Sequence, residues 1–401
     1  MRILFITPYL PSLIRVRSFN FIKSLKKQGH SIYLVSLVPD KKEFDNLEEV
    51  EKYCEKVETF FLPKYKSIWN CVKYLISCVS LQSAYCFSGK MKKRVKELLE
   101  KEKFDLIHVE FIRAAYYLPK ENTLPSVFDS VDCVTNLYKQ FSDAKYSFFM
   151  RFIRYIEWFK LSRYEPREAG RFDKVLITTE NEKKGLLELD KNLPVEVIAN
   201  GVDFEYFKPQ NAEIEPFSIV MTGKMSYIAN ELAFIFFAEK IWPKIRMEIP
   251  QAILYVVGNC PGPKVKKFKS SDIIITGYVP DLRLYLSKAS VVVAPIVAGG
   301  GIQNKILEAM SMAKPVVTTS KACEAFPMDV SNCLLAGDTP DEFARAVINI
   351  LNDANFAESL GAKARQFVEK YYNWDEKTTT LLQIYKGLQI EVTGQFPVEI
   401  R

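Results

Sequence analysis

Three consecutive glycines, residues 299 to 301, stand directly before a segment with helical periodicity. Glycine lets the backbone approach a ligand closely, and the free N–H groups at a helix start attract anions such as a diphosphate. Lys305 and Glu308 follow three residues apart, and therefore on one side of the helix. The lysine would add a full positive charge. The glutamate would repel phosphate, so its expected ligand is a neutral diol such as ribose, which a carboxylate binds through two hydrogen bonds.

This segment alone leaves a second interpretation open. Glycine-rich turns between a strand and a helix recur in many α/β proteins, and a lysine and a glutamate three apart also form solvent-exposed ion pairs. The helical face that is expected to pack on the core carries Ile302, Ile306, Ala309, Met310 and Ala313. The alternative to a ligand site is therefore a flexible loop followed by an ordinary amphipathic helix.

Strand-like and helical segments alternate along the whole chain. The first half contains RILFIT, SIYLVSLV, DLIHVE, SVFDSV and KVLITT, with helical patterns near 17–28, 90–102 and 145–168. The second half contains FSIVMTG, AILYVVG, DIIITGYV, VVVAP and KPVVTT, with helical patterns near 229–246, 281–288 and 374–388. Such alternation is typical of βα units around a parallel sheet, in which ligands bind beyond the carboxyl ends of the strands. We expect an α/β fold of two Rossmann-like halves joined near residues 200–215.

Composition and charge narrow the class of protein. The chain has 401 residues, 48% of them hydrophobic, which is enough for two sizeable cores. Its formal net charge is +7, and the basic residues are scattered rather than gathered in one block. That distribution favours an anionic ligand or a membrane surface over nucleic acid as the partner.

Cysteine and histidine usage indicates no structural metal. The eight cysteines form no C-x-x-C pair, and the two histidines cannot complete a zinc site of usual spacing, so free thiols in a reducing compartment are expected. MRILFITPYL reaches Pro8 before an apolar core of signal-peptide length accumulates, which predicts a first strand and a cytoplasmic protein. Residues 69–87 contain Lys73 and fall short of a membrane span.

Several motifs in order resemble the nucleotide-sugar glycosyltransferases of family four, also called glycosyl transferases group 1. They are NGVD at 200–203, TGKMSYIANELA at 222–233, P-x-A-x-L-Y-V-V-G at 250–258, GYVPD at 277–281 and G-x-x-x-K-x-L-E-A-M-x-x-x-x-P-V-V at 301–317. Within that family the chain most resembles the sugar transferases associated with bacterial exopolysaccharide clusters, through RVRSFNFIKSL, FDSVDC and RYEPREAGRFDKVLITTE. The resemblance covers nearly the whole chain.

The resemblance implies the GT-B fold, in which two Rossmann-like domains with parallel sheets face a central cleft. We accordingly expect residues 1–205 to bind the acceptor, 206–371 to bind the nucleotide-sugar donor, and 372–401 to form a helix that packs back on the N-terminal domain, with a tail. The helical pattern near 374–388 by itself is compatible with packing on either half. The implied reaction is a retaining transfer of a sugar from a nucleoside diphosphate to an acceptor hydroxyl, without metal or cofactor. The implied partners are the nucleotide-sugar donor and a glycan or lipid-linked acceptor.

The resemblance also carries donor-binding roles onto this sequence. Lys224, after Gly223, matches the basic position that neutralises donor phosphates in the family, and Lys305 matches the second basic residue. Glu308 matches the ribose-binding glutamate. The loop that reads the nucleobase is matched by Gly277, Tyr278 and Val279, and the donor loop by Gly299, Gly300, Gly301, Ile302, Gln303 and Asn304. A surface lysine and an ordinary turn are the alternatives for Lys224 and Gly277.

Three positions depart from the family pattern. The glutamate that family members commonly have eight positions before the ribose-binding one is replaced by Gly300. The first loop has prolines instead of paired glycines, with Arg15 and Arg17 as candidate phosphate or acceptor contacts, or as the solvated start of a helix. FDSVDC stands where the family often has a histidine, so that Asp129 and Asp132 occupy this loop.

Front-face displacement requires a stabilised leaving group and a closely held acceptor hydroxyl. Lys224, Lys305 and the helix start are the candidates for stabilising the diphosphate. Asp129 or Asp132 could orient the acceptor or accept its proton late in the reaction. An aspartate after a strand also often caps the next helix, and that alternative stays open for both residues. His108 lies within an apolar run and is expected to be a core residue.

The segment at 146–160, YSFFMRFIRYIEWFK, interleaves aromatic residues with arginines. One side of the expected helix carries Phe148, Arg151, Arg154, Tyr155 and Trp158. This pattern suits the inner surface of a membrane that carries a lipid-linked acceptor. The alternative is a helix packed between the two domains.

Other functions stay open beside glycosyl transfer. A nucleotide-sugar epimerase of the same fold would need further acid–base residues, which the sequence does not locate. A non-catalytic partner subunit would not need Lys305 or Glu308, yet both are present. An NAD-dependent dehydrogenase is disfavoured because no G-x-G-x-x-G follows RILFIT.

Overall fold

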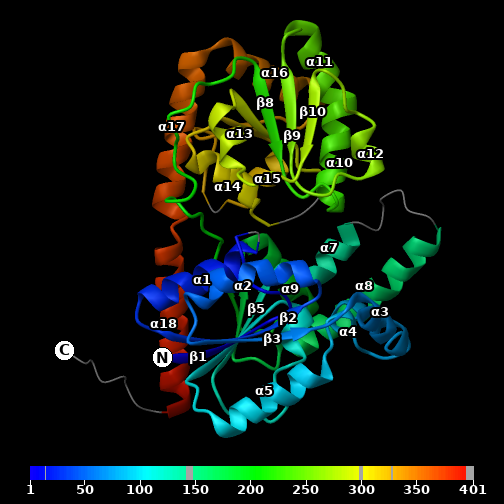
Figure 1. The fold of residues 1–401 in the computed structure, drawn as a ribbon, viewed down its shortest axis with the longest axis vertical. Helices are drawn as coiled ribbons and strands as arrows, with labels where there is room; N and C mark the ends of the chain where they lie inside the picture. Colours follow the sequence, from blue (N-terminus) through cyan, green and yellow to red (C-terminus); the bar gives the residue numbers. More distant parts are fainter. Residues whose placement is uncertain (14, 141–147, 298–300, 327, 394–401) are drawn as a thin grey trace. The chain divides into compact units, whose positions relative to one another are not determined.

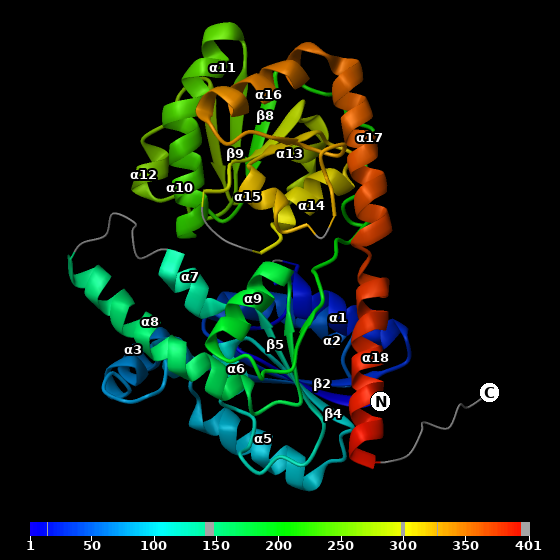
Figure 2. The ribbon, with the colours of Figure 1, turned by 180° about the vertical axis from the view of Figure 1, so that it is seen from behind.

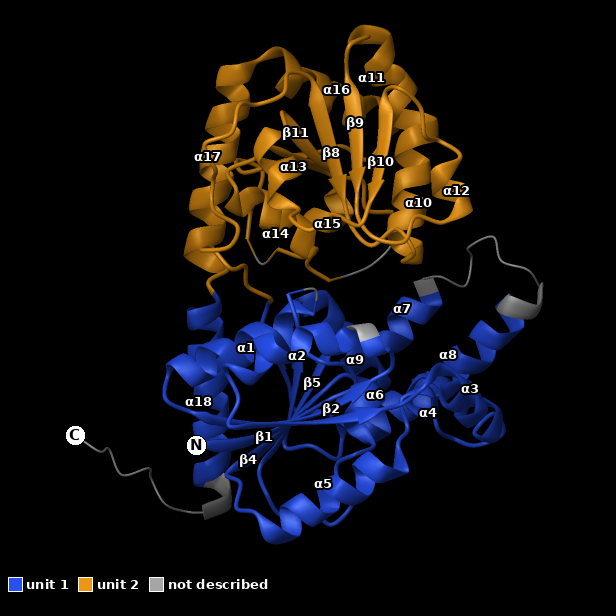
Figure 3. Ribbon diagram, in the orientation of Figure 1, with its two compact units in different colours: residues 1–199, 374–401 blue, residues 200–373 orange. Residues whose placement is uncertain are grey.

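The computed structural model describes residues 1–401 except 14, 141–147, 298–300, 327 and 394–401 (Figure 1). The chain divides into two compact units, residues 1–199 with 374–401 and residues 200–373 (Figure 3). The sequence places the corresponding boundaries at 205/206 and 371/372. Within the second unit, Val202 pairs with Asn373, so the segment that enters the unit and the segment that leaves it lie side by side.

Unit 1 (1–199 with 374–401) is built around a seven-stranded sheet of order β3-β2-β1-β4-β5-β6-β7, in which every pair is parallel. Its central strands are runs of apolar residues because helices cover both faces of a parallel sheet. The strands are β1 (Arg2–Thr7), β2 (Ser31–Val38), β3 (Lys56–Phe61), β4 (Leu106–Glu110), β5 (Ser126–Val131), β6 (Lys174–Ile177) and β7 (Val195–Val197).

Alternation along β1 divides the core of unit 1 in two. Leu4 and Ile6 belong to one apolar cluster and Ile3 and Phe5 to another, because successive side chains of a strand point to opposite faces.

The helices of unit 1 are α1 (Val16–Lys27), η1 (Lys41–Asn46), α2 (Leu47–Glu51), α3 (Lys64–Lys73), α4 (Leu81–Tyr85), α5 (Gly89–Lys101), α6 (Ile112–Ala115), α7 (Val134–Gln140), α8 (Phe148–Ala169), α9 (Glu180–Leu189) and α18 (Trp374–Thr393).

Helix α18 belongs to unit 1 although the 174 residues of unit 2 precede it (Figure 2). Trp374 packs edge-on against Phe21 of α1, with ring centroids 5.2 Å apart. Asp375 accepts hydrogen bonds from Ser24 (2.7 Å) and Lys27 (2.6 Å). These contacts join α18 to α1.

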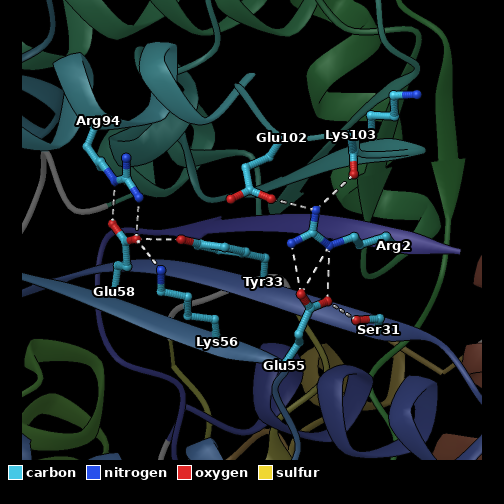
Figure 4. A network of polar contacts seen from close by, with 9 residues as sticks. All are labelled: Arg2, Ser31, Tyr33, Glu55, Lys56, Glu58, Arg94, Glu102 and Lys103. Carbon is cyan, nitrogen blue, oxygen red and sulfur yellow. Dashed lines mark hydrogen bonds and ion pairs between the residues drawn. The ribbon is translucent and has the colours of Figure 1, made fainter. Parts of the chain in front are cut away.

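Charged side chains join the amino-terminal edge of this sheet to the helices around it (Figure 4). Arg2 forms ion pairs with Glu55 (2.8 Å) and Glu102 (2.9 Å). Arg94 of α5 donates two 2.8 Å hydrogen bonds to Glu58 of β3, and these hydrogen bonds are the main cause that lowers the pKa of Glu58 to about 2. This network lies at the edge opposite to the carboxyl ends of the strands, which indicates a structural role.

Unit 2 (200–373) has a six-stranded parallel sheet of order β10-β9-β8-β11-β12-β13. The expected α/β fold with two parallel sheets is confirmed. The strands are β8 (Ser218–Thr222), β9 (Ile253–Val257), β10 (Ile273–Gly277), β11 (Val291–Ala294), β12 (Val316–Thr318) and β13 (Leu335–Ala336). The helices are α10 (Ile228–Phe236), η2 (Phe237–Ile241), α11 (Trp242–Glu248), α12 (Pro263–Lys266), α13 (Arg283–Lys288), α14 (Asn304–Ser311), α15 (Ser320–Cys323), α16 (Pro340–Asn352) and α17 (Ala354–Tyr371).

Helix α14 is shorter than its sequence pattern indicates. Ile302 precedes the helix, and Ala313 follows it with a φ of 55°, in the left-handed region. The N–H of Lys314 then bonds to the carbonyl of Ala309 (3.0 Å), and that of Ala313 to the carbonyl of Met310 (3.0 Å), which is the bond pattern of a Schellman cap.

Among the described residues, no helix combines the length and the apolar character needed to cross a bilayer.

We predict that two glycines inside helices respond oppositely to alanine. Alanine is preferred over glycine in a helix interior by about 1 kcal/mol. A Cβ on Gly387 of α18 meets nothing within 4 Å, so Gly387→Ala should raise the free energy of unfolding. A Cβ on Gly361 of α17 would lie 2.1 Å from the carbonyl oxygen of Ala313, so Gly361→Ala should lower it by about 1–3 kcal/mol.

Urea unfolding followed by circular dichroism measures both effects, with each variant compared with the parent in the transition of its own unit. A Gly361→Ala protein as stable as the parent would show that α17 does not pack closely on the end of α14.

Candidate functional site

The loops that the sequence singles out in unit 2 follow the carboxyl ends of its strands. Gly223 and Lys224 follow β8, Tyr278 follows β10, and the segment leading to α14 follows β11. Because the carboxyl ends of parallel strands meet at one edge of a sheet, these loops share an edge. Gly299 and Gly300 lie outside the described residues, and Gly301 begins the described part of the glycine-rich loop.

The side-chain amide of Asn230 connects two of these loops. Lys305 Nζ donates a 2.6 Å hydrogen bond to Asn230 Oδ1, and Asn230 Nδ2 donates a 3.0 Å hydrogen bond to the carbonyl oxygen of Lys224. Asn230 lies on α10 and is buried, whereas the side chain of Lys224 is exposed. The structure therefore brings the Lys305 ammonium and the backbone of Lys224 together around one amide.

The loop glycines permit this arrangement by close approach. A Cβ on Gly223, whose φ is 144°, would lie 2.7 Å from Asn230 Nδ2. A Cβ on Gly258, whose φ is 155°, would lie 1.8 Å from the carbonyl oxygen of Gly223. Only glycine fits these positions without displacing the backbone or the amide.

The surroundings of Lys305 and Glu308 shift the pKa of both side chains. Burial lowers the pKa of Lys305 to about 8, and the nearby Glu308 carboxylate opposes that shift. Burial raises the pKa of Glu308 to about 7, and Lys305 opposes that shift in turn. Burial thus disfavours both charges, and a bound anion would favour the charged form of Lys305.

The remaining residues of the predicted donor loop surround the start of α14. Asn304 accepts a 3.1 Å hydrogen bond from Asn200, and Gln303 donates a 3.1 Å hydrogen bond to the carbonyl of Gly301. Ile302 is buried. These contacts fix the chain between Gly301 and the helix that carries Lys305 and Glu308.

The loop after β10 presents an exposed aromatic ring. Gly277 has a φ of 72°, which favours glycine, and the side chain of Tyr278 is 67% exposed. Val279, the third predicted residue, is half-buried. The Arg283 guanidinium lies 4.0 Å from the centroid of the Tyr206 ring. Burial, followed by the Asp281 carboxylate, raises the pKa of Tyr206, and Glu308 and Tyr278 contribute in the same direction.

Tyr206 is therefore near both the predicted base loop and the predicted ribose residue, although no motif of the sequence singles it out. Asn230 is also new as a candidate site residue. It stands in the segment IANELAFIF as a buried amide in a largely apolar helix, and this contrast is the signal that could have found it.

In unit 1, Arg17 and Asp129 form an ion pair with each other and are not free to bind a ligand. Arg17 Nε donates a 2.7 Å hydrogen bond to Asp129 Oδ2, and the two side chains are 4% and 1% exposed. Arg17 Nη1 also donates to the carbonyl of Ile198 (2.8 Å). Arg15 forms a two-point ion pair with Glu43, at 2.7 and 2.9 Å. Both arginines predicted to contact phosphate or acceptor thus have partners within the unit.

Asp132 is less buried than Asp129, and the backbone changes direction between them. Val131 has a φ of 69°, which is strained for a β-branched residue, and the pairing of β5 with β6 shifts register there. Asp132 is half-buried. Burial raises its pKa to about 6, with Arg17 opposing the shift and Asp129 adding to it.

Two buried glutamates, rather than either aspartate, bind the N–H groups at the start of α7. The N–H of Cys133 donates to Glu182 of α9 (2.7 Å). The N–H groups of Val134 (2.9 Å) and Thr135 (2.8 Å) donate to Glu165 of α8. The alternative that Asp129 or Asp132 caps the next helix is therefore not what the structure shows. Glu165 and Glu182 fix the backbone that directly follows Asp132.

Two further titratable groups of the sheet are buried. His108 is stacked on Phe5 and shares a 2.7 Å hydrogen bond with Tyr385, and burial lowers its pKa to about 4. It is a core residue, as the sequence predicts. Glu110 ends β4, and burial, with Asp129 adding to it, raises its pKa to about 8. This edge of the sheet therefore has three carboxyl groups near one arginine.

Comparison with known proteins supports a glycosyltransferase. Residues 216–353, most of unit 2, match the family described as glycosyl transferases group 1. An uncharacterized 44.6 kDa protein from the cps region of Klebsiella pneumoniae is 20% identical over 370 residues, which span 88% of this chain and 90% of the relative. An uncharacterized glycosyltransferase of Methanocaldococcus jannaschii is 26% identical over 92 residues, or 22% of this chain and 24% of the relative.

Solved structures share the fold over nearly the whole chain. Sucrose-phosphate synthase from Thermosynechococcus elongatus is 17% identical with a TM-score of 0.71, and the match covers 97% of this chain and 99% of that one. HepE of Anabaena, in complex with UDP and glucose, is 16% identical with a TM-score of 0.68, covering 96% and 100%. The two comparisons agree: residues 216–353 match the group 1 glycosyltransferases, and the whole chain has the fold of these solved structures.

Proposed function

We propose that this enzyme transfers a sugar from a nucleoside diphosphate donor to an acceptor hydroxyl with retention of configuration, in bacterial polysaccharide or glycan biosynthesis. The observation that carries the proposal is the Lys305 ammonium held on Asn230, beside the loop of Lys224. The relative from a cps region and the solved complex of HepE with UDP and glucose support the substrate class. No metal or cofactor is required by this proposal.

The donor diphosphate would bind between Lys305, the start of α14 and the exposed side chain of Lys224. A partly buried lysine is unfavourable without a nearby anion, and a diphosphate supplies that anion. The same two lysines would stabilise the additional charge that develops on the diphosphate as the glycosidic bond breaks. The donor site would thereby act as the electrostatic part of the catalytic machinery.

The nucleoside would lie toward Glu308, one helical turn after Lys305 on the same side of α14. Glu308 would accept hydrogen bonds from the two ribose hydroxyls in its ionised form. The base would stack on the exposed ring of Tyr278, with Tyr206 near the ribose, and would bond to the backbone of Gly277 and Val279. In this proposal, the residues with a shifted pKa and the exposed tyrosine at this edge each bind one part of the nucleotide.

The acceptor, a glycan or a lipid-linked sugar, would be bound by unit 1. Asp132 is the proposed base because its pKa of about 6 is close to the pH at which an enzyme of this kind works. Asp129 is held by Arg17 inside the unit and would position Asp132 rather than contact substrate.

Product analysis with a labelled donor tests the function directly. Transfer to an acceptor supports the proposal. Isomerisation of the donor sugar would support an epimerase, and an unaltered donor with every acceptor offered would support a non-catalytic subunit.

We predict that variants of the two donor-site residues differ in ligand selectivity. Lys305→Ala should weaken binding of UDP by about ten- to a hundredfold, since a charge-assisted hydrogen bond contributes about 1.5–3 kcal/mol, and should affect uridine less. Glu308→Gln should weaken UDP more than its 2′,3′-dideoxy analogue, because only the diol loses hydrogen bonds. Calorimetric titration measures each affinity.

Lys288→Ala is the matched control. Lys288 is an exposed lysine, and its backbone carbonyl accepts a hydrogen bond at the amino-terminal end of β8, which is the end opposite to the proposed donor site. If Lys305→Ala and Glu308→Gln bind every ligand as this control does, the assigned donor site is wrong.

We predict that UDP affinity falls as the pH rises through about 8. Lys305 has a lowered pKa of about 8, so its ammonium is present below that pH and is lost above it. UDP should therefore bind with net proton uptake near pH 9, which titrations in buffers of different ionisation enthalpy measure. Lys305→Arg keeps its charge at this pH and should abolish both the fall and the uptake. An unchanged alkaline profile in Lys305→Arg would assign the titration to another group.

We predict that substitution of the two aspartates of FDSVDC has different effects: one change lowers stability and the other lowers turnover. Asp129→Asn leaves the buried Arg17 charge without its carboxylate and should lower stability by about 3–5 kcal/mol. Asp132→Asn should keep the parent's stability and UDP affinity while turnover falls by about a hundredfold or more. Thermal unfolding, calorimetry and release of nucleoside diphosphate from the donor give the three readouts. Full turnover of Asp132→Asn would contradict its assignment as the base.

A further inference from the structure

Helix α3 of unit 1 turns most of its apolar side chains to the solvent. Ser67 is its one fully buried residue. Trp69 is 69% exposed, and Ile76, in the turn that follows the helix, is 99% exposed. The exposed apolar residues of this region are Phe61, Tyr65, Ile68, Trp69, Val72, Leu75 and Ile76. An apolar surface of this kind generally marks an interaction site.

The stretch of sequence that contains α3 is basic, although Lys64 pairs with Asp40 (3.7 Å) and Arg94 with Glu58 (2.8 Å). The sequence from Thr59 to Lys96 contains no aspartate or glutamate. Its basic residues are Lys64, Lys66, Lys73, Lys90, Lys92, Lys93, Arg94 and Lys96. Three of these lie on α3 itself, beside the exposed apolar side chains. The partner of this surface is therefore expected to be both apolar and anionic.

Helix α8 continues the surface because its side chains hold the segment after α3. Lys160 Nζ donates hydrogen bonds to the carbonyl oxygens of Tyr74 (2.7 Å) and Val79 (3.0 Å). Glu157 accepts hydrogen bonds from the N–H groups of Leu81 (2.7 Å) and Gln82 (3.1 Å). Both views of the fold show α3, α4 and α8 together in unit 1 (Figures 1 and 2).

The outward-facing residues of α8 have the same character as those of α3. Phe152, Tyr155 and Phe159 are exposed, and so is Arg151. Trp158 is only half-exposed and packs beside Tyr155, with ring centroids 5.8 Å apart. The side chains of residues 148–150 lie outside the described ones. Of the side that the sequence predicts to be interfacial, only Arg151 and Tyr155 are exposed, whereas Arg154 and Trp158 are half-buried. The outer face of α8 is the smaller part of a surface whose main part is α3.

We propose that α3, the turn after it and the outer face of α8 form a docking surface for an anionic lipid bilayer. Tryptophan and apolar side chains with flanking lysines favour the interface, where the rings lie at headgroup level and the ammonium groups reach the lipid phosphates. Each basic residue near an anionic membrane adds attraction that is screened by salt. This surface does not involve the donor site, so its test is independent of the proposed reaction.

Co-sedimentation with vesicles tests the proposal. The full chain should bind vesicles of phosphatidylglycerol mixed with phosphatidylcholine, bind pure phosphatidylcholine much less, and lose binding as ionic strength rises. Ile68→Ser/Trp69→Ser should reduce the partition coefficient by about tenfold or more, since both side chains would leave the interface. The matched control is Ile214→Ser/Met247→Ser, which removes two exposed apolar side chains from unit 2 and should bind as the parent does.

A second pair of variants isolates the charge. Lys66→Glu/Lys73→Glu should reduce binding to the anionic vesicles by at least tenfold. Lys184→Glu/Lys191→Glu changes the net charge equally at exposed positions of unit 1 outside this surface and should have a much smaller effect. Equal losses in the two charge variants would mean that only the net charge matters, and the assignment to α3 would be wrong.

Tryptophan fluorescence tests the proposal on the parent protein, in which no substitution can disturb the fold. Trp242 and Trp374 are buried, so a blue shift of tryptophan emission on adding anionic vesicles should come from Trp69 and the half-exposed Trp158, and Trp69→Phe should reduce it. A parent that stays in the supernatant with both kinds of vesicle, or shows no blue shift, overturns the proposal. So does a lipid-free dimer, detected by sedimentation velocity, that Ile68→Ser/Trp69→Ser dissociates, because the surface would then bind a second copy.

Discussion

The arrangement of the proposed donor site in unit 2 depends on one buried amide. Asn230 accepts from Lys305 and donates to the backbone of Lys224, so the loop after β8 and the helix after β11 are fixed to the same group. This bridge is possible only because Gly223 has no Cβ, and Gly223 in turn fits only because Gly258 has none. Two glycines thus determine where a lysine charge lies, and that charge is the basis of the proposed diphosphate site.

The carboxyl edges of the two sheets have opposite chemistry. In unit 2 the edge carries Lys224 and Lys305, with Glu308 beside Lys305 and Asp281 paired with Arg283. In unit 1 the edge carries Glu110, Asp129 and Asp132 near Arg17. A cationic edge suits a phosphorylated donor, whereas an edge rich in carboxyl groups suits a neutral hydroxyl that must lose a proton. The difference follows from side chains on the loops that end the strands of two similar sheets.

The sequence predicts the fold well because buried parallel strands are apolar runs that helical patterns separate, and both signals are local. It also locates the loops that follow the strands, because strand ends and glycines are local signals too. The partnership of Arg17 with Asp129 joins residues 112 positions apart, and that of Asn230 with Lys305 joins residues 75 apart. Periodicity and spacing hold no information on such pairs. The left-handed Ala313 was likewise hidden, because its apolar side chain continues the helical pattern.

The position of α18 in the chain has a consequence for biosynthesis. Trp374, Leu381 and Tyr385 fill the core on the α1 face of unit 1, yet the ribosome makes them after the whole of unit 2. A nascent chain that has reached residue 199 therefore contains all seven strands and α1, but the part of this face that α18 covers is still exposed. Unit 2 has all of its residues before unit 1 does, so the later domain can finish folding first. Until then, the exposed face of the first sheet is a substrate for chaperones.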